Sequence, residues 1–548
     1  MKKKKFIFVV GGVMSGVGKG ITTASIATIL KARGLSVTTL KIDPYINVDA
    51  GTMNPTEHGE VFVLNDGYET DQDMGNYERF LEKVLPNDNY MTTGRVYQSV
   101  IERERNLEYK GKCVEVVPHI PLEVIHRIEK AQEKAKADVT ITEIGGTIGE
   151  YQNILFLEAA RMMRNKYPGD VLFVLVSYLP NPSKVGEPKT KPTQYAARTL
   201  NGAGIQADVI VARSEIPLDK KRKEKIAVFC NINENHVISA PDVDTIYDVP
   251  VNFEKDGLSD TILSILNAKD EAKESDLTAW KTLSRKIRTL EKEVKIGIVG
   301  KYFETGSFIL SDAYISVIEA VKHAAYANGR KPKIEWLNSI EYEKDPKKVA
   351  ELSDYDGIVI PGGFGSRGIE GKIIAIKYCR EKKIPYFGLC YGMQLMVIEY
   401  ARNKAGMKDA HTPEVNDKTP FPVIDIMIEQ KERLKNKDYG GTMRLGAYPA
   451  TVKKGTIAHK AYKKERISER HRHRYEVNPE FIERIEQAGL IFSATSPDKH
   501  LMEIAELPQS QHPFFVGAQF HPEFQTSPFA PHPLFHAFVK AAKEREEE

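Results

Sequence analysis

The chain has 548 residues, more than the roughly 250–300 at which a single hydrophobic core stops growing, so we expect two or more domains. Hydrophobic residues make up 41% of the chain and charged residues 28%, and the formal net charge is only +3. This near balance excludes a chain built for general polyanion binding, and we expect no nucleic-acid partner.

The start of the chain carries no pattern of membrane insertion. The stretch MKKKKFIFVVGG places only five apolar residues, Phe6 to Val10, before the first glycine pair. That run is shorter than the apolar region of a signal peptide or a membrane span. The four cysteines form no C-x-x-C pair, as is usual in a reducing cytosol. We therefore expect a cytoplasmic protein without a membrane partner.

Short apolar runs alternate with helical patterns along most of the chain. This alternation predicts βαβ units, and so an α/β fold with parallel sheets. A charged stretch over 268–293 has no strand pattern and predicts an exposed, partly helical linker. A second alternating series begins at Val294. We therefore expect two parallel-sheet domains, 1–267 and 294–548.

The stretch GGVMSGVGKG, residues 11–20, follows the first apolar run and precedes a helical pattern. Its glycines let backbone N–H groups face phosphates, the helix N-terminus adds partial positive charge, and Lys19 would neutralise the β and γ phosphates. The stretch departs from the common G-x-x-x-x-G-K-[ST] loop, because Val13 stands five positions before Gly18 and Gly20 follows Lys19. From this motif alone, a nucleotide site and a tight turn with a solvated lysine remain equally open.

Two carboxylates are candidates for holding Mg²⁺, which ordinary P-loops bind partly through the hydroxyl that Gly20 lacks. Glu143 ends the apolar run 139–144, at the carboxyl edge of the predicted sheet, where ligands of open α/β folds bind. Asp73 lies in an acidic loop, 66–75. One or two carboxylates together with phosphate oxygens are a usual Mg²⁺ environment. For Asp73 alone, a solvated loop charge is the simpler interpretation.

Residues 186–194, GEPKTKPTQ, place Lys189 and Lys191 on a turn-rich segment after a predicted strand. Two lysines around a threonine could grip a second triphosphate. By spacing alone, a surface loop is the more frequent arrangement.

The stretch IPYFGLCYGMQLMVIEYA, residues 384–401, is an apolar strand, a G-L-C-Y-G turn and a helix. It matches a nucleophile elbow with Cys390 in place of serine. A helix N-terminus favours the thiolate form. The other cysteines lack this context, and Cys379 fits an ordinary helix face. A merely buried thiol at Cys390 is the weaker interpretation.

A cysteine nucleophile that attacks an amide also needs a base and an oxyanion hole. FHPEF, residues 520–524, supplies His521 with Glu523 two positions on. If this stretch is a strand, both side chains share a face, and Glu523 orients the His521 ring. PGGFGSRG, residues 361–368, follows a predicted strand and offers the Gly363 N–H to the oxyanion.

The run ERHRHRYEVN, 469–478, is basic but short, and in a nearly neutral chain it does not indicate nucleic-acid binding. Arg474 in this run is a candidate clamp for the carboxylate of a small substrate. A plain solvated face remains open.

Together these motifs resemble the CTP synthase family over nearly the whole chain. The resemblance is carried by long stretches such as KIDPYINVDAGTMNPTEHGEVFV, ETDQDMGNYERF, TEIGGTIG, KTKPTQ, KIAVFCN, PGGFGSRG, GLCYGMQ, GGTMRLG, ERHRHRYEVN and QFHPEF. It implies two Rossmann-like domains: a dethiobiotin-synthetase-like P-loop domain that binds ATP and UTP, and a class I glutamine amidotransferase domain.

The resemblance also implies roles for individual residues. ATP would be held by Gly16, Val17, Gly18, Lys19, Gly20, Ile21, Asp73, Asp242 and Val243, with Lys41 near the phosphates and Mg²⁺ on Asp73 and Glu143. UTP or CTP would be held by Ser15, Glu150, Tyr151, Gln152, Lys189, Thr190, Lys191, Pro192, Thr193, Gln194 and Lys225. Glutamine would be held by Gly363, Tyr391, Gly392, Met393, Gln394, Glu414 and Arg474. Cys390, His521 and Glu523 would be the catalytic triad, and His58 and Val61 would line an ammonia passage.

The implied activity is ATP-dependent amination of UTP at C4 with glutamine as nitrogen donor. The implied regulators are GTP as activator, with Arg367 as a contact, and CTP as inhibitor. The implied assembly is a homotetramer, a dimer of dimers, which could form filaments. The chain departs from the family pattern at Glu150–Gln152, at Pro241, at Tyr391, at Pro413 and in the short segment 428–441, IEQKERLKNKDYGG, where relatives carry a GTP lid.

Two other functions fit part of the pattern. An ATP-dependent amidoligase of the cobyrinate or cobyrate type would share both modules, but KTKPTQ and DPYINVDAGTMNP disfavour it. A partitioning or filament-forming ATPase would use the variant P-loop alone, and in such a protein the triad of the C-terminal half would be superfluous.

Overall fold

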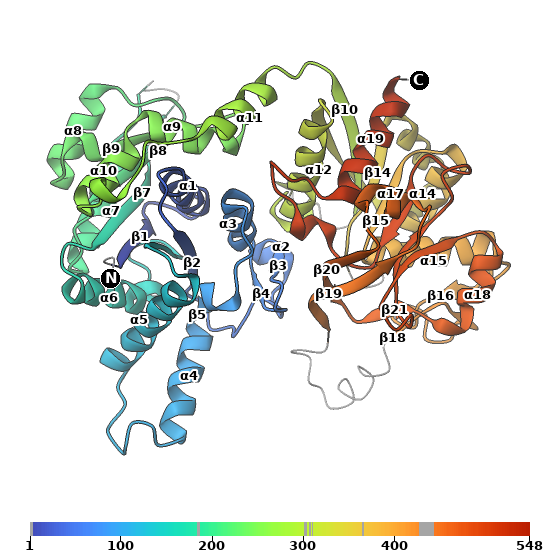
Figure 1. Ribbon diagram of the computed structural model, residues 1–548, viewed down its shortest axis with the longest axis horizontal. Coiled ribbons are helices and arrows are strands. Elements are labelled where there is room, and N and C mark those ends of the chain that lie inside the picture. Colours follow the sequence, from blue (N-terminus) through green and yellow to red (C-terminus); the bar gives the residue numbers. More distant parts are fainter. Residues whose placement is uncertain are drawn as a thin grey trace. The chain divides into compact units, whose positions relative to one another are not determined.

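The computed structural model describes residues 4–182, 187–300, 304–305, 308–309, 311–363, 367–426 and 443–547. The chain divides into two compact units (Figure 1). The first unit consists of Met1–Ala50 and Asp73–Arg288, and the second of Gly51–Gln72 and Thr289–Glu548. A short piece of the N-terminal half therefore belongs to the second unit.

The first unit is built from alternating strands and helices. Its strands are β1 (Lys5–Gly11), β2 (Val37–Asp43), β5 (Tyr90–Thr92), β6 (Val139–Ile144), β7 (Val171–Tyr178), β8 (Val209–Ser214) and β9 (Val237–Pro241). Its α-helices are α1 (Lys19–Ala32), α3 (Asp73–Leu81), α4 (Thr93–Arg105), α5 (Val116–Ala135), α6 (Ile154–Lys166), α7 (Lys191–Gly202), α8 (Lys220–Cys230), α9 (Val249–Lys255), α10 (Leu258–Ile265) and α11 (Thr278–Arg288).

These strands form one seven-stranded sheet in the order β5-β2-β6-β1-β7-β8-β9, with every pair parallel. Strand β1 is buried along its whole length, as expected for a parallel sheet covered on both faces. Phe6, Phe8 and Val10 pack into a core with side chains from α5, α6 and α7. Helices lie on both faces in Figure 1. The carboxyl ends of the strands therefore share one edge, where the P-loop begins.

Helix α11 closes this unit. Its Trp280 ring lies 5.1 Å from the Phe80 ring of α3 and 6.2 Å from the ring of Tyr247. Aromatic packing of this kind buries a large apolar area. The charged stretch after residue 268 thus includes a helix anchored on the first unit.

The second unit contains a larger sheet and several small ones. Its strands are β3 (Val61–Val63), β4 (Glu69–Asp71), β10 (Glu293–Gly300), β11 (Glu304–Thr305), β12 (Phe308–Ile309), β13 (Lys331–Asn338), β14 (Gly357–Ile360), β15 (Tyr386–Leu389), β16 (Ala410–His411), β17 (Phe421–Pro422), β18 (Ile424–Ile426), β19 (Arg444–Val452), β20 (Arg466–His473), β21 (Tyr475–Val477), β22 (Ile491–Thr495), β23 (Met502–Glu506) and β24 (Phe515–Ala518). Its α-helices are α2 (Pro55–His58), α12 (Ile315–Ala327), α13 (Ser339–Lys344), α14 (Ile369–Lys382), α15 (Tyr391–Asn403), α17 (Ile457–Tyr462), α18 (Pro479–Gln487) and α19 (Pro533–Glu547).

The larger sheet has nine strands in the order β13-β10-β14-β15-β24-β23-β22-β19-β20. The first five are parallel, and β24 to β20 are antiparallel. One face carries a core with α14 and α15, and the other carries a core with α12 and α19 (Figure 1). The predicted fold class, two α/β domains built on parallel sheets, is confirmed, although the second sheet also has an antiparallel half.

Strands β3 and β4 pair antiparallel, with Val61 opposite Asp71. The hairpin they form is tied to other parts of the second unit, since Ala447 N donates to Asn65 O at 2.9 Å. The Glu60 carboxylate accepts from the backbone N and the hydroxyl of Ser316. We call residues 61–71 the β3–β4 hairpin below.

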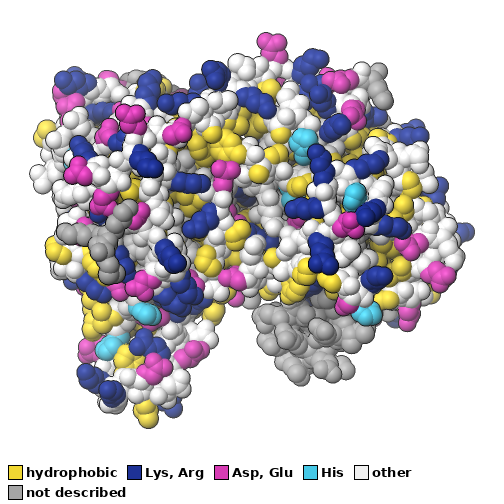
Figure 2. Space-filling view, viewed as in Figure 1, with side chains coloured by type: hydrophobic (Ala, Val, Ile, Leu, Met, Phe, Trp, Pro, Cys, Tyr) yellow, Lys and Arg dark blue, Asp and Glu magenta, His cyan; other side chains and the backbone are white. Residues whose placement is uncertain are grey.

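On the surface shown in Figure 2, Lys and Arg side chains are interspersed with Asp and Glu side chains. This mixture agrees with the small net charge of +3. Within the described ranges, every helix is too short or too polar to cross a membrane.

Candidate active sites

Cys390 sits on a sharp turn between β15 and α15. Its backbone has φ 49° and ψ −100°, a region that a non-glycine residue adopts only when the surrounding structure imposes it. The turn is held because Cys390 N donates to Ala518 O at 2.7 Å and Gln394 N donates back to Cys390 O at 3.2 Å. The predicted elbow geometry is therefore present, with the thiol at the first turn of α15.

His521 and Glu523 form a buried pair. His521 Nδ1 lies 2.7 Å from Glu523 Oε1. Our reason for expecting this pair was wrong: strand β24 ends at Ala518, and residues Pro522–Gln525 form a 3₁₀ turn. The tight turn, rather than strand alternation, brings the carboxylate back to the ring.

The His521 ring lies beside Cys390. A Cβ placed on Gly362 would be 2.9 Å from His521 Cε1 and 3.7 Å from Cys390 Cβ, so a residue without a side chain is needed between them. Burial would lower the pKa of His521, but the charges of Glu523 and Cys390 outweigh it and raise the pKa to about 10. The ring is thus held as an imidazolium that can give a proton to a leaving group. Its Nε2 atom has no hydrogen bond within the described residues.

A cavity of about 310 Å³ opens in front of these residues. Its wall includes Cys390 and His521 together with Gly363, Tyr391, Gln394, Glu414, Arg474 and Val61. Two more predicted glutamine contacts, Gly392 and Met393, stand between Tyr391 and Gln394 but are not part of the wall. The Met393 side chain is fully buried in the core of this unit, and the role of both residues stays a prediction. His58 ends α2, is exposed and is also absent from the wall.

Two groups next to the sulfur were not foreseen. The Gln519 amide Nε2 donates to Cys390 Sγ at 3.8 Å, and Sγ lies 3.8 Å from the Arg472 carbonyl oxygen. Gln519 is fully buried. Its oxygen accepts from Gln394 Nε2, which also donates to Tyr475 O at 3.0 Å. Gln394 is therefore fixed by contacts within the protein.

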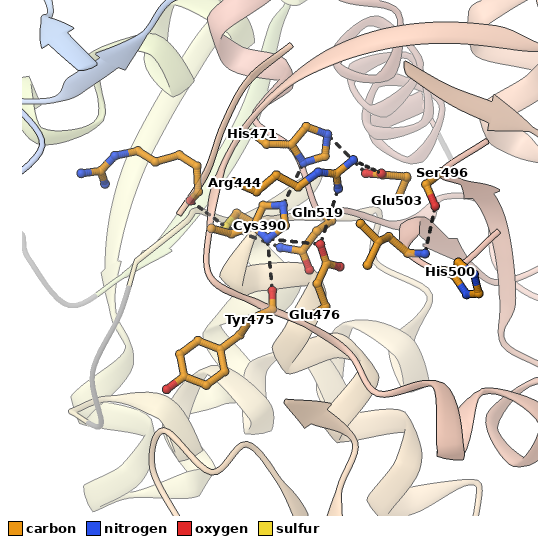
Figure 3. A network of polar contacts seen from close by, with 12 residues as sticks. Cys390, Arg444, His471, Tyr475, Glu476, Ser496, His500, Glu503 and Gln519 are labelled. Carbon is orange, nitrogen blue, oxygen red and sulfur yellow. Dashed lines mark hydrogen bonds and ion pairs between the residues drawn. The ribbon is translucent and has the colours of Figure 1, made fainter. Parts of the chain in front are cut away.

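Behind Cys390 lies a buried polar network (Figure 3). His473 Nδ1 lies 3.2 Å from Tyr475 O, and His473 Nε2 lies 2.8 Å from His471 Nδ1. His471 Nε2 then faces Glu503 Oε2 at 3.3 Å. Burial holds the pKa of both histidines well below the usual value, so the rings are neutral.

The proton positions in this network follow from one acceptor. A backbone carbonyl only accepts, so Nδ1 of His473 carries hydrogen and its Nε2 accepts from Nδ1 of His471. His471 Nε2 is then an acceptor that has no hydrogen bond among the described residues, and a protonated Glu503 Oε2, 3.3 Å away, would supply the missing donor. Burial raises the pKa of Glu503 to about 7, while Arg444, 2.9 Å from its other oxygen, opposes the rise.

In the first unit, the loop after β1 leads into α1 at Lys19. Val13 in this loop has φ 79°, an unusual value for a β-branched residue that marks local strain. Lys19 is nearly buried, and its ammonium donates to Gly146 O at 3.0 Å. The lysine thus bridges the loop after β1 and the loop after β6.

A second lysine stands between the candidate carboxylates. The Lys41 ammonium contacts the Asp73 carboxylate and lies 3.0 Å from Glu143 Oε1. Lys41 and Glu143 are neighbours in the register of β2 and β6. Burial raises the pKa of Glu143, Asp73 adds to the rise, and Lys41 opposes it. Tyr77 donates to the other oxygen of Glu143.

Asp73 is not in a loop, as we expected, but is the first residue of α3. Its position explains the missing hydroxyl after Lys19. A Cβ on Gly20 would be 1.9 Å from Asp73 Oδ1, so any side chain there would require the Asp73 carboxylate to move. The space that an ordinary P-loop gives to Ser or Thr is here filled by the Asp73 carboxylate.

The carboxylate oxygens of Asp73 and Glu143 are the ligand type that Mg²⁺ prefers. They converge on one point, now held by the Lys41 ammonium, so the donor set fits a divalent cation that shares phosphate oxygens. Among the described residues, no group of three or more His, Cys, Asp or Glu side chains is arranged to hold a metal by itself.

Beside the P-loop lies a small cavity of about 20 Å³. Gly18, Ile21 and Val243 line it, with Pro241, Asn252 and Phe253. Asp242 instead pairs with Arg213, whose Nη2 lies 2.8 Å from Asp242 Oδ1. Arg213, Asn252 and Phe253 were not foreseen because they carry no local motif.

The predicted UTP residues come from four segments: the P-loop, the loop 150–152, residues 189–194 and α8. A Cβ placed on Gly149 would be 3.3 Å from the Thr199 methyl of α7, so the loop that carries Glu150, Tyr151 and Gln152 runs beside this helix. The Tyr151 side chain is almost fully exposed. Thr190 and Thr193 are buried, and Gln194 Nε2 donates to Thr190 Oγ1 at 3.1 Å.

The remaining predicted UTP residues lie at the surface. Lys189 pairs with Glu187 at 2.6 Å. Lys191 and Pro192 begin α7. Lys225 is exposed on α8, and Ser15 is exposed in the P-loop.

Two family models match the chain: "CTP synthase N-terminus" over residues 5–268 and "Glutamine amidotransferase class-I" over residues 309–541. With the P-loop in one unit and the Cys390 elbow in the other, they define a ligase that carries its own glutamine amidotransferase module. The chain is 51% identical over 546 residues to the CTP synthase of Pyrococcus abyssi, and the match covers 99% of both chains. It is 48% identical over 540 residues to the CTP synthase of Bacillus licheniformis, and that match covers 98% of both chains. The chain belongs to the CTP synthase family.

Among solved structures, the glutaminase domain of the Trypanosoma brucei relative, determined with bound acivicin, matches with 36% identity and a TM-score of 0.42. The match covers 46% of this chain and 94% of that domain.

Proposed function

We propose that this enzyme aminates UTP at C4 to give CTP, using ATP to activate the ring and glutamine to supply ammonia. The observation that carries the proposal is the arrangement of Cys390, His521 and Glu523 at a cavity whose wall also holds Glu414 and Arg474. A thiol with a paired imidazolium is suited to amide cleavage. One carboxylate and one guanidinium suit the ammonium and carboxylate groups of free glutamine.

In the glutaminase half, Cys390 Sγ attacks the side-chain amide carbon of glutamine. The Gly363 N–H stabilises the oxyanion. The His521 imidazolium gives its proton to the departing nitrogen, so that ammonia leaves and a thioester remains. Water then adds to the thioester, with neutral His521 taking its proton, and releases glutamate and the thiolate. Glu523 keeps the ring oriented in both steps.

In the synthetase half, the C4 oxygen of UTP is a poor leaving group. Transfer of the γ-phosphoryl group of ATP to this oxygen turns it into phosphate, and ammonia displaces the phosphate at C4. Lys19 and Lys41 offset the charge of the moving phosphoryl group. Asp73 and Glu143 would hold Mg²⁺, which supplies charge neutralisation of the phosphates when bound.

The nucleotide contacts follow the family resemblance. Gly18, Ile21 and Val243 line the small cavity beside the P-loop, which fits an adenine contact. The loop 149–152 and the start of α7 would hold UTP, or CTP as the inhibitor. Ammonia would pass between the domains near His58 and Val61, and Val61 lies in the wall of the glutaminase cavity.

We extend the proposal to regulation, assembly and location. GTP would activate the glutaminase, with Arg367 as a contact, but the predicted lid, residues 428–441, lies outside the described residues. CTP would inhibit, and the active form would be a cytoplasmic homotetramer able to form filaments.

The test is product formation by the purified enzyme with ATP, UTP, Mg²⁺ and either glutamine or ammonium chloride. The proposal expects CTP from both nitrogen sources, with one glutamate formed per CTP in the glutamine reaction. Glutamine cleavage without CTP formation from either source would contradict it. A cobyrinate-type amidoligase would leave UTP unchanged in both reactions.

A further inference from the structure

The side chain of Arg470 is among the most deeply buried charges of the second unit, with 1% exposure. Its guanidinium donates to Val63 O at 3.1 Å and to the side-chain oxygen of Asn65. It also lies over the Phe62 ring, 5.3 Å from the centroid. All three partners belong to the β3–β4 hairpin, about four hundred residues earlier in the chain.

The main chain of Arg470 holds the catalytic histidine. The backbone N of His521 donates to Arg470 O at 2.8 Å, and Arg470 N donates to Gln525 Oε1 at 3.1 Å. The loop 521–525 is therefore fastened to the same residue that grips the hairpin.

A second path runs through aromatic rings. The Phe62 ring packs edge-to-face on Phe524 at 5.1 Å, and the Phe524 ring is stacked on the His521 ring at 5.1 Å with an interplanar angle of 15°. Stacking of this kind limits ring rotation, because moving the imidazole would forfeit the aromatic contact. His521 is therefore connected to the hairpin in two ways, through Arg470 and through the rings of Phe524 and Phe62.

These contacts explain the basic run 469–478, for which a solvated face was one interpretation. Alternate residues of β20 point to opposite faces. Arg470 and Arg472 hold the hairpin, the latter through Glu69 at 2.8 Å. His471 and His473 lie on the other face of the strand and contact each other in the buried network, in which His471 is labelled in Figure 3.

We propose that Arg470 is a positioning residue for His521, and that the β3–β4 hairpin is therefore a working part of the glutaminase site. This inference rests on the proposed function, in which His521 protonates the leaving nitrogen. The hairpin ends at Asp71, two residues before Asp73, the proposed Mg²⁺ carboxylate of the first unit. The position of His521 thus depends on the β3–β4 hairpin, and this hairpin comes just before Asp73 in the sequence.

The first test is Arg470→Met, with glutamate release measured separately from CTP formation. Loss of the guanidinium leaves Val63 O and Asn65 Oδ1 without a donor and frees the loop 521–525 to shift. We expect kcat for glutamine hydrolysis to fall about tenfold or more. KM should stay within about twofold, because Glu414 and Arg474 are untouched. CTP formation from ammonium chloride should be unchanged.

Two variants on the same strand serve as controls. Arg466→Met removes an exposed arginine of β20 and should leave both activities as in the unaltered enzyme. Arg470→Lys keeps the charge but not the fork of donors, and should recover part of the lost kcat.

A variant of the hairpin keeps the proposal testable if Arg470→Met fails to fold. Asn65→Ala removes one acceptor of Arg470 and should lower kcat for glutamine hydrolysis a few-fold, with no further loss when combined with Arg470→Met. Full glutaminase kcat in Asn65→Ala would overturn the proposal. So would a change in KM alone, or an equal loss with glutamine and ammonia in Arg470→Met. Failure of the proposed function would look different, because the unaltered enzyme would then form no CTP from ammonia.

Discussion

The Cys390 site and the Lys41 site differ in how their charged groups are paired. Around Cys390, the base and its orienting carboxylate already contact each other, and His521 Nε2 has no hydrogen bond within the described residues. Around Lys41, the cation faces Asp73 and Glu143, so the groups that would bind phosphates and Mg²⁺ neutralise one another. The groups around Cys390 are thus already arranged as a triad, whereas Lys41, Asp73 and Glu143 would have to exchange their ion pairs for contacts with the proposed ligands.

The two sites also differ in what supports them. The Cys390 elbow is flanked by buried strands and by Gln519, Gln394 and the histidine network. Of the synthetase carboxylates, Asp73 and Glu143 both contact Lys41, and Glu143 also accepts from Tyr77. Substituting one charged side chain should therefore change activity by different amounts in the two units.

Apart from loss of the Cys390 nucleophile itself, the largest effect is expected for Lys41→Met. The Asp73 and Glu143 carboxylates would lose the Lys41 ammonium that contacts both of them, and the phosphoryl group would lose one source of charge compensation. CTP formation should fall by about 10²–10³ with either nitrogen source, while glutamate release without nucleotides stays unchanged. An equal fall in glutamate release would show that the sites do not work separately.

The next effect is expected for Glu523→Gln. The Glu523 charge raises the pKa of His521, so its loss lowers that pKa and the imidazolium disappears at a lower pH. Glutamine hydrolysis should fall about 10²-fold, and the alkaline limb of its pH profile should move to lower pH. A pH–rate profile of glutamate release measures both effects. An unmoved alkaline limb would mean that Glu523 does not control the charge of the ring.

A smaller effect is expected for Gly20→Ala. The added Cβ would force Asp73 away from α1, and the ATP-dependent step should slow about tenfold. Gly202→Ala is a matched control, since a Cβ there meets no atom within 4 Å. CTP formation from ammonia at saturating UTP is the measurement. Equal rates in both variants would remove our explanation of the missing P-loop hydroxyl.

The smallest effect is expected for Glu503→Gln, which places a permanent donor opposite His471. Because the pKa of Glu503 is raised from 4.5 to about 7 in the folded chain, its protonation favours folding at low pH, and that contribution is lost as the pH rises from 4.5 to 7. The variant should lack this loss and melt roughly 2–4 °C higher at neutral pH. Identical melting curves at pH 5 and pH 8 for both proteins would contradict the proton assignment.

Local signals in the sequence were enough for the α/β fold class and for the elbow at Cys390. A strand, a glycine turn and a helix are determined by neighbouring residues, and burial of the strand follows from its composition. The pairing of His521 with Glu523 was expected for the wrong reason, because the stretch after β24 forms a 3₁₀ turn. Asp73 was read as a loop residue because an acidic run gives no helical pattern.

The residues that hold the Cys390 site in place could not be predicted from local sequence patterns. Arg470 meets Asn65 across 405 positions, and His471 meets Glu503 across a sheet. Such contacts depend on which strands become neighbours, and no spacing rule in one sequence reports that. For the same reason, the sequence did not predict that residues 51–72 belong to the second unit, because that assignment also depends on contacts between segments far apart in the chain.

The central claim is that the second unit makes the nitrogen nucleophile and the first unit consumes it. The most direct test is Cys390→Ala, assayed with ATP, UTP and either glutamine or ammonium chloride. We predict that glutamine-dependent CTP formation falls at least about 10³-fold, since the nucleophile is gone, while the ammonia-dependent rate stays at that of the unaltered enzyme. Loss of both activities in a folded variant, or retention of both, would contradict the account.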